Sequence, residues 1–197
     1  MKKDLMGAAL MALLCLGTTG AGQAGTIAVT VNTAGLSGTS GRFEFDLFDG
    51  DGLANNTVTI SNIVTNGTLG AVDCSVGCTP SYVLSDAGGL GILLQDLTLG
   101  SSFSFLLNFS NNFGVGSPDQ FALFLLNPAT NFTLLNTSLD TPFSDALLLV
   151  NLDGTARNVQ TADTGVSVSA VPEPGYAALL LATLPLLQLR KRLAVRR

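Results

Sequence analysis

Apolar and polar residues alternate along several short segments of the chain, which is the pattern of half-buried β-strands. The clearest alternating sets are Ile27, Val29 and Val31; Phe43, Phe45 and Leu47; and Phe103, Phe105, Leu107 and Phe109. With the other apolar runs, the pattern predicts strands over residues 26–31, 42–48, 57–64, 81–84, 90–99, 102–109, 120–127, 132–135, 145–151 and 165–169. The phenylalanines at alternating positions are expected to form the core.

Turn-forming residues separate these segments, since Gly, Asn, Ser and Thr occur throughout the middle of the chain. No stretch of about 12 residues there combines helical apolar spacing with capping residues. Residues 25–170 therefore predict one all-β domain, an antiparallel β-sandwich of jelly-roll type, with a single barrel as the alternative. The segment is long enough to bury a core of its own.

The first 24 residues have the three parts of a secretory signal peptide. Lys2 and Lys3 form a charged start, residues 5–16 an apolar stretch, and Gly22-Gln23-Ala24 a small-residue cleavage site. We expect the Sec translocon and signal peptidase to act on residues 1–24, with cleavage after Ala24. A first transmembrane helix is the alternative, but the apolar run is short and ends in Gly and Thr.

The last 27 residues, 171–197, have a different order of features. Val171-Pro172-Glu173-Pro174 is followed by an apolar stretch over 176–189 and by the basic cluster Arg190-Lys191-Arg192. The two prolines keep the tetrapeptide extended and out of helix. The apolar stretch is shorter than the roughly 20 residues that span a bilayer, so we expect a weak, temporary helical span, with the basic cluster on the cytoplasmic side. An anchor that is never cleaved is the alternative.

This order of a Pro-Glu-Pro signal, an apolar stretch and terminal basic residues resembles the PEP-CTERM sorting tail of Gram-negative bacteria, which the membrane enzyme exosortase reads. The resemblance covers the tail alone. It implies export across the inner membrane, processing of the tail, and a final place on the cell surface or in the extracellular matrix. It also implies a setting of exopolysaccharide and biofilm, in which such proteins often have short β-domains without known activity.

Charge is distributed unevenly along the chain. Residues 25–171 contain 12 of the 14 acidic residues but, of the basic residues, only Arg42 and Arg157, which gives a formal charge of −10. Such a field repels nucleic acid and favours cations or neutral partners. Negative charge also keeps a secreted domain soluble, and that simpler interpretation is favoured.

Residue inventory limits the chemistry available to this chain. It has no histidine, which excludes the Ser-His-Asp triad, a Cys-His pair and imidazole metal ligands. A glycosidase with two carboxylates remains, with Glu44 as the only glutamate of the predicted domain. A non-enzymatic matrix or surface protein is the favoured interpretation. A carbohydrate-binding module is the alternative, although residues 25–171 have no Trp and only Tyr82 as a tyrosine for stacking on sugars.

Cys74 and Cys78 are the two cysteines that remain outside the predicted signal peptide. An even number of cysteines in an exported chain, separated by a short loop with Gly77, predicts a disulfide. Its expected role is to fix a turn, because a short loop removes little entropy from the unfolded chain. Free thiols or a metal site are the alternatives.

The segment Asp49-Gly50-Asp51-Gly52 has oxygen ligands with glycines between them, as Ca²⁺ loops do. Asp49, Asp51 and Asn55 would be the ligands, but the segment departs from the EF-hand spacing. The favoured interpretation is a polar hairpin turn that joins the strands predicted at 42–48 and 57–64, because Asp-Gly is a strong turn signal. No other cofactor is expected.

Overall fold

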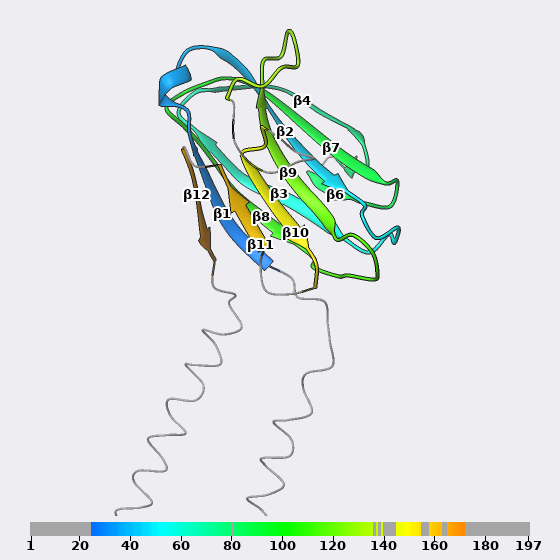
Figure 1. Cartoon of the computed structure of the whole chain (residues 1–197). Coiled ribbons are helices and arrows are strands. Elements are labelled where there is room, and N and C mark those ends of the chain that lie inside the picture. Colours follow the sequence, from blue (N-terminus) through cyan, green and yellow to red (C-terminus); the bar gives the residue numbers. More distant parts are fainter. Residues whose placement is uncertain are drawn as a thin grey trace, which may run out of the picture.

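Two antiparallel sheets of six strands pack face to face in the computed structural model, which describes residues 25–79, 81–135, 137, 139, 145–154, 158–162 and 165–171 (Figure 1). The strands are β1 (Gly25–Asn32), β2 (Ser40–Phe48), β3 (Thr57–Thr65), β4 (Thr68–Val76), β5 (Cys78–Thr79), β6 (Val83–Ser85), β7 (Leu90–Thr98), β8 (Ser102–Phe109), β9 (Asp119–Leu126), β10 (Leu148–Leu152), β11 (Asn158–Thr161) and β12 (Val166–Ala170). A single 3-10 turn, η1 (Ala34–Leu36), is the helical element of these residues. The all-β prediction is confirmed.

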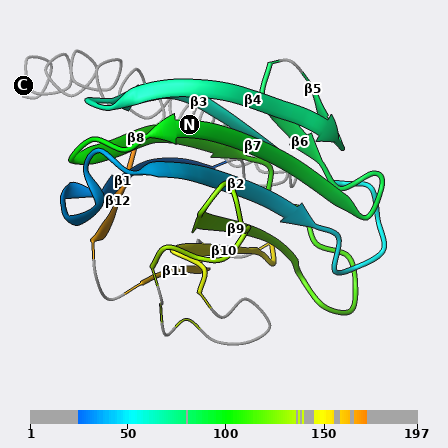
Figure 2. The ribbon, with the colours of Figure 1, turned by 90° about the horizontal axis from the view of Figure 1, so that it is seen from above.

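Each sheet takes its strands from distant parts of the chain. Sheet A has the order β12-β1-β8-β3-β6-β5, and sheet B has the order β11-β10-β9-β2-β7-β4. The second view, from above, shows the strands of sheet B following one another in the order β4, β7, β2, β9, β10 and β11 (Figure 2). Because the two sheets are distinct, the chain forms a sandwich rather than the single barrel considered from the sequence.

The core lies between the sheets and contains the alternating residues that the sequence indicated. All ten residues of the three alternating sets are at most 2% exposed. Aromatic rings from the two sheets meet there: Phe43 of β2 stacks on Phe103 of β8 with ring centroids 4.0 Å apart, and Phe45 meets Phe105 edge-on at 5.3 Å. Apolar burial of this kind is the main stabilising term in folding.

Three strands of the structure were not predicted from the sequence pattern, and one predicted strand is wrong. The unpredicted strands are β4, β5 and β11. β4 lies at the edge of sheet B and is exposed along most of its length, so no alternation marks it. The segment 132–135 is not a strand: only Thr133 forms an isolated bridge, to Leu126, after a turn in which Asn131 has a positive φ of 56°.

A bulge in β3 changes which residues face the core. The register with β8 shifts between Ser61 and Val64, and Asn62 there has a φ of 51°. An extra residue in a strand reverses the faces that follow it. Ile63 therefore packs against the core, whereas Val64 is 62% exposed.

The first and last described residues lie together at one end of the sandwich. β1 pairs with β12, and the N–H of Val171 donates a 3.1 Å hydrogen bond to the carbonyl of Thr26. The predicted signal peptide and, after Val171, the sorting motif and basic cluster lie outside the described residues. In the part of the chain that the structure describes, no helix has the length and apolar character needed to cross a membrane.

Candidate functional site

The loop after β2 does not form the hairpin that the sequence favoured. β2 belongs to sheet B and β3 to sheet A, so residues 49–56 cross from one sheet to the other at the end of the sandwich. A hairpin would join two paired neighbours of one sheet. The crossing instead brings Asp49 and Asp51 to the start of β9, where Asp119 lies.

Three carboxyl groups meet at this end. Asp49, Asp51 and Asp119 each have a carboxylate oxygen within 4.8 Å of those of the other two. Asp49 and Asp51 are half-buried, whereas Asp119 is fully buried. Oxygen donors of this kind are those that hard cations such as Ca²⁺ select.

Backbone N–H groups hold Asp119 and Asp51 in place. Oδ1 of Asp119 accepts hydrogen bonds from the N–H groups of Gly50 at 2.7 Å and of Asp51 at 3.3 Å. Oδ2 of Asp51 accepts one from the N–H of Gly114 at 2.7 Å. This last bond is the main reason that the pKa of Asp51 lies below its ordinary value, with the N–H of Leu53 lowering it further.

A fourth carboxyl group, that of Asp86 in the loop between β6 and β7, lies next to Asp119. Its Oδ2 accepts the N–H groups of Asn56 at 2.7 Å and Asn55 at 3.2 Å, whereas its Oδ1 has no hydrogen-bond partner. Burial raises the pKa of Asp86, and the neighbouring Asp119 carboxyl raises it further. Two buried carboxyl groups therefore lie against each other.

Two adjacent asparagines link the acidic residues. Nδ2 of Asn56 donates to Oδ2 of Asp119 at 2.6 Å, while its own backbone N–H binds Asp86. Nδ2 of Asn55 donates to Oδ2 of Asp51 at 3.3 Å, and Oδ1 of Asn55 accepts from Asn56 at 2.7 Å. Asn55, predicted as a ligand, thus lies beside the group and hydrogen-bonds to one of its carboxylates.

Glycines allow the loops to come this close. A Cβ at Gly50 would collide with the carbonyl oxygen of Pro118, which precedes Asp119. A Cβ at Gly114 would lie 2.5 Å from Cδ1 of Leu53 and 3.0 Å from Oδ2 of Asp51. The loop between β8 and β9 therefore packs directly on the loop between β2 and β3.

Sequence reasoning identified Asp49 and Asp51 but missed Asp86 and Asp119. Asp86 lies between the strands predicted at 81–84 and 90–99, and Asp119 lies directly before the strand predicted at 120–127, after Pro118. In an antiparallel sandwich, the end of one strand lies beside the start of its neighbours, so acids at such junctions could have been grouped. The sequence alone does not show which of these strand junctions lie at the same end of the sandwich.

The two cysteines form the predicted disulfide. Cys74 lies in β4 and Cys78 in β5, their Cα atoms are 5.2 Å apart, and their sulfur atoms are bonded. β4 belongs to sheet B and β5 to sheet A. The bond therefore closes the tight connection between two edge strands of different sheets.

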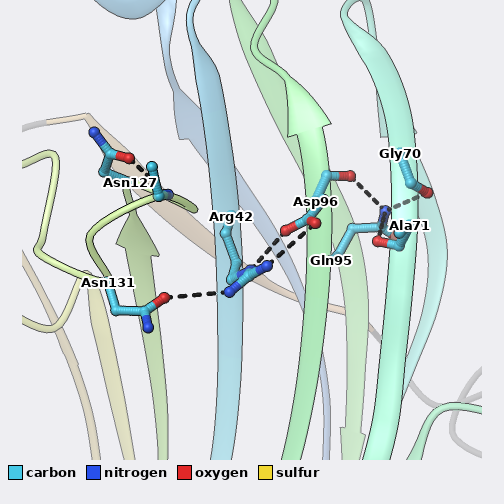
Figure 3. A network of polar contacts seen from close by, with 8 residues as sticks. Arg42, Gly70, Ala71, Gln95, Asp96, Asn127 and Asn131 are labelled. Carbon is cyan, nitrogen blue, oxygen red and sulfur yellow. Dashed lines mark hydrogen bonds and ion pairs between the residues drawn. The ribbon is translucent and has the colours of Figure 1, made fainter.

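A second polar network links strands of sheet B (Figure 3). The guanidinium of Arg42 donates to Asp96 of β7 through Nε at 2.6 Å and through a terminal nitrogen at 3.2 Å, and it reaches Oδ1 of Asn131 at 3.2 Å. The buried Gln95 donates to the carbonyls of Gly70 and Ala71, where β4 is irregular. These contacts connect β2, β7, β4 and the turn after β9.

A pocket of about 280 Å³ lies beside this network. Its lining residues are Ser40, Gly41, Thr68, Leu69, Gly70, Asp96, Leu97, Thr98 and Pro128, none of which is aromatic. Its one carboxylate, that of Asp96, is already paired with Arg42. The pocket therefore lacks the stacking surface that sugar-binding sites normally use.

Glu44 and Asp46 project from the face of β2 opposite to Phe43 and Phe45, a face that the alternation of polar and apolar residues alone would leave in solvent. Asp46 is instead only 5% exposed, and its Oδ1 has no hydrogen-bond partner. Burial, and then the Glu44 carboxyl beside it, raises the pKa of Asp46 to about 8. The two groups lie close enough to share a proton.

Comparison with protein-family models, with curated proteins and with solved structures finds no match to this chain.

Proposed function

We propose that this chain is an exported, non-enzymatic protein of the cell surface or extracellular matrix, associated with exopolysaccharide and sorted by exosortase. The sorting tail is carried by Val171, Pro172, Glu173 and Pro174 and by the basic cluster Arg190, Lys191 and Arg192. The signal peptide, residues 1–24, directs the chain to the Sec translocon and signal peptidase. In this proposal the inner membrane holds the tail only until it is processed.

One observation carries most of this proposal: the two ends of the domain lie side by side. Thr26 and Val171 are joined by a hydrogen bond at the end of the β1–β12 pair. Cleavage after Ala24 and near Pro172 would leave every described strand pair intact. A domain arranged in this way can be released from a leader and a tail without unfolding.

The disulfide between Cys74 and Cys78 supports the same compartment. Structural disulfides form and persist in oxidising environments, outside the cytoplasm. Exposed edge strands such as β4 and β5 open easily in the absence of a crosslink, because they are paired on one side only. A crosslink there suits a domain that works outside the cell.

The non-enzymatic assignment is supported by the state of the carboxyl groups. Glycosidases hold their two carboxyl groups about 5 Å or more apart, on either side of a sugar bond. Glu44 and Asp46 instead lie on the same face of one strand, close enough to hydrogen-bond. A carbohydrate-binding module is the less supported alternative, because Tyr82 packs against the core and does not form an open platform.

The jelly-roll assignment also belongs to this proposal. Successive strands alternate between the sheets through much of the chain, as β1, β2, β3 and β4 do. Such alternation is typical of jelly rolls, in which two Greek keys wrap around one core. Capsid, lectin and cupin domains use this architecture for binding or for structure.

Deletion of the exosortase gene in the native host tests the sorting claim. In the presence of exosortase, we expect the protein in the extracellular or matrix fraction. Without exosortase, we expect the protein in the membrane fraction with its tail still attached. Replacing Pro172, Glu173 and Pro174 by alanine should have the same effect as the deletion, whereas Asp73→Ala, on exposed β4, should be sorted normally. Identical fractionation with and without exosortase would refute the proposal.

A further inference from the structure

The acidic group at the loop end of the sandwich is assembled from three loops. Asp49 and Asp51 come from the β2–β3 loop and Asp86 from the β6–β7 loop, and Asp119 is the first residue of β9, directly after the β8–β9 loop. Carboxylate oxygens of Asp49, Asp51 and Asp119 lie within 4.8 Å of one another. Acidic groups can gather on a surface without any ligand, so the proximity of these carboxylates does not by itself define a site.

The carboxyl group of Asp86, beside Asp119, is buried and incompletely hydrogen-bonded. Its side chain is only 1% exposed, it lies against the fully buried carboxyl of Asp119, and its Oδ1 has no hydrogen-bond partner. Burying an ionised carboxylate without a partner is strongly unfavourable. Two such groups in contact require either a shared proton or a cation.

No basic side chain of the described residues lies near to supply that charge. Arg42 is the only Lys or Arg among them, and it pairs with Asp96. It is also seven positions before Asp49 along β2, which is on the order of 20 Å in an extended strand. Arg157, the other basic residue of segment 25–171, lies outside the described residues.

We propose that Asp49, Asp51 and Asp119 form a binding site for one Ca²⁺ ion, with the buried carboxyl group of Asp86 supporting the site through its contact with Asp119. All the donors are oxygens, as Ca²⁺ prefers, and Ca²⁺–oxygen distances of about 2.3–2.6 Å place ligands across the ion about 5 Å apart. Separations of up to 4.8 Å between the carboxylate oxygens of Asp49, Asp51 and Asp119 are compatible with that diameter, and a site built from flexible loops suits Ca²⁺ better than the strict octahedral geometry of Mg²⁺. The ion joins the β2–β3 loop to the start of β9 and neutralises the buried pair. This inference does not depend on the sorting proposal.

Equilibrium dialysis of the purified full chain in detergent, after treatment with a chelator, tests the site with Ca²⁺ as the only added probe. We expect saturable binding of one ion per chain, with a dissociation constant between about 10⁻⁶ and 10⁻³ M. Mg²⁺ at matched ionic strength should bind at least about tenfold more weakly. No saturable binding, or equal binding of both ions, would overturn the proposal.

Variants that each remove one negative charge distinguish Ca²⁺ binding at these residues from non-specific attraction of Ca²⁺ to an acidic domain. Asp119→Asn and Asp86→Asn should each weaken Ca²⁺ binding at least about tenfold, whereas Asp73→Asn removes the same charge from exposed β4 and should leave binding unchanged. If Asp119→Asn fails to fold, Asp51→Asn serves in its place, because Asp51 is only half-buried. Equal losses in Asp73→Asn and in the site variants would contradict the assignment.

Thermal unfolding provides an independent readout of the same site. A ligand that binds only the folded state raises its stability, so the melting temperature should rise by several degrees in millimolar Ca²⁺ over chelator. Arg157→Gln should keep this rise. A rise that appears only in Arg157→Gln would mean that Arg157 neutralises the acids, and would refute the Ca²⁺ site.

Discussion

The backbone N–H of Val171 donates a hydrogen bond of 3.1 Å to the carbonyl oxygen of Thr26, although the two residues are 145 positions apart in the chain. β1 and β12 thus bring both ends of the domain to the end of the sandwich that also holds the acidic loops, because Gly25 pairs with Phe109 just before the β8–β9 loop. Any leader or tail would leave from this end.

The core should depend strongly on Phe45. Its ring is fully buried and meets the rings of Phe43, Phe103, Phe105 and Phe121. We expect Phe45→Ala to lower the free energy of unfolding by about 3–5 kcal/mol, because it removes apolar contacts and leaves a cavity. Urea denaturation measures the loss. Phe132→Ala is the matched control: Phe132 is 77% exposed, and its loss should be below about 0.5 kcal/mol.

Replacing both cysteines by serine should have a moderate effect. The disulfide closes a loop with a sequence separation of 4, for which loop entropy accounts for about 2 kcal/mol of stability. Denaturation of Cys74→Ser/Cys78→Ser beside the oxidised wild type gives this difference. Reduction of the wild type should produce the same loss, and alkylation of natively folded, exported protein should label neither thiol. Two labelled thiols would contradict the expected bond.

Stability should fall as the pH rises from about 4 to about 8, because of Asp46. Its pKa is raised from 3.8 to about 8 in the folded state, so the folded protein holds this proton more tightly than the unfolded chain does. The contribution is fully present below the unfolded pKa and is lost as the pH rises through the folded one. One such proton gives a slope of at most about 1.4 kcal/mol per pH unit.

The variant Asp46→Asn isolates this effect. It should remove the decline in stability between about pH 4 and about pH 8, because an amide does not ionise. The free energy of unfolding of the variant, minus that of the wild type, should therefore be larger at pH 8 than at pH 4. Asp73→Asn, on exposed β4, should keep the wild-type slope. Parallel stability curves for the wild type and Asp46→Asn would show that Asp46 is ionised in the folded protein.

The ion pair between Arg42 and Asp96 should contribute little to global stability. Its side chains are 22% and 33% exposed, so water screens the attraction. A double-mutant cycle with Arg42→Ala and Asp96→Ala should give a coupling energy of about 0.5–1 kcal/mol, smaller in high salt. A coupling energy above about 2 kcal/mol would contradict this expectation, because it would mean that water does not screen the attraction between the two side chains.

Alternation of apolar residues predicted much of the fold, because it records which strands have one buried face. β1, β2 and β8 are of this kind, and their inward residues match the predicted sets. β4 could not be predicted in this way, since an edge strand that is exposed on both faces requires no alternation. The predicted strand at 132–135 failed because its apolar residues follow a turn rather than pair in a sheet.

The acidic site could be predicted only in part, for a related reason. Asp49 and Asp51 are close in sequence, so their spacing indicated a loop with oxygen donors. Asp86 and Asp119 reach the same place through pairing of β6 with β3 and of β9 with β2. Strand order within a sheet depends on contacts between distant segments, which local patterns do not contain.

Intact-mass spectrometry of the protein recovered from its native host tests the central claim most directly. If the chain is exported and sorted as proposed, the mass should correspond to a chain that begins after Ala24 and ends near Pro172–Pro174, without Arg190–Arg197. The described domain, from Gly25 to Val171, would then be the mature protein. Recovery of exported protein with an intact C-terminus would contradict tail removal, and a retained Met1 would contradict the signal peptide.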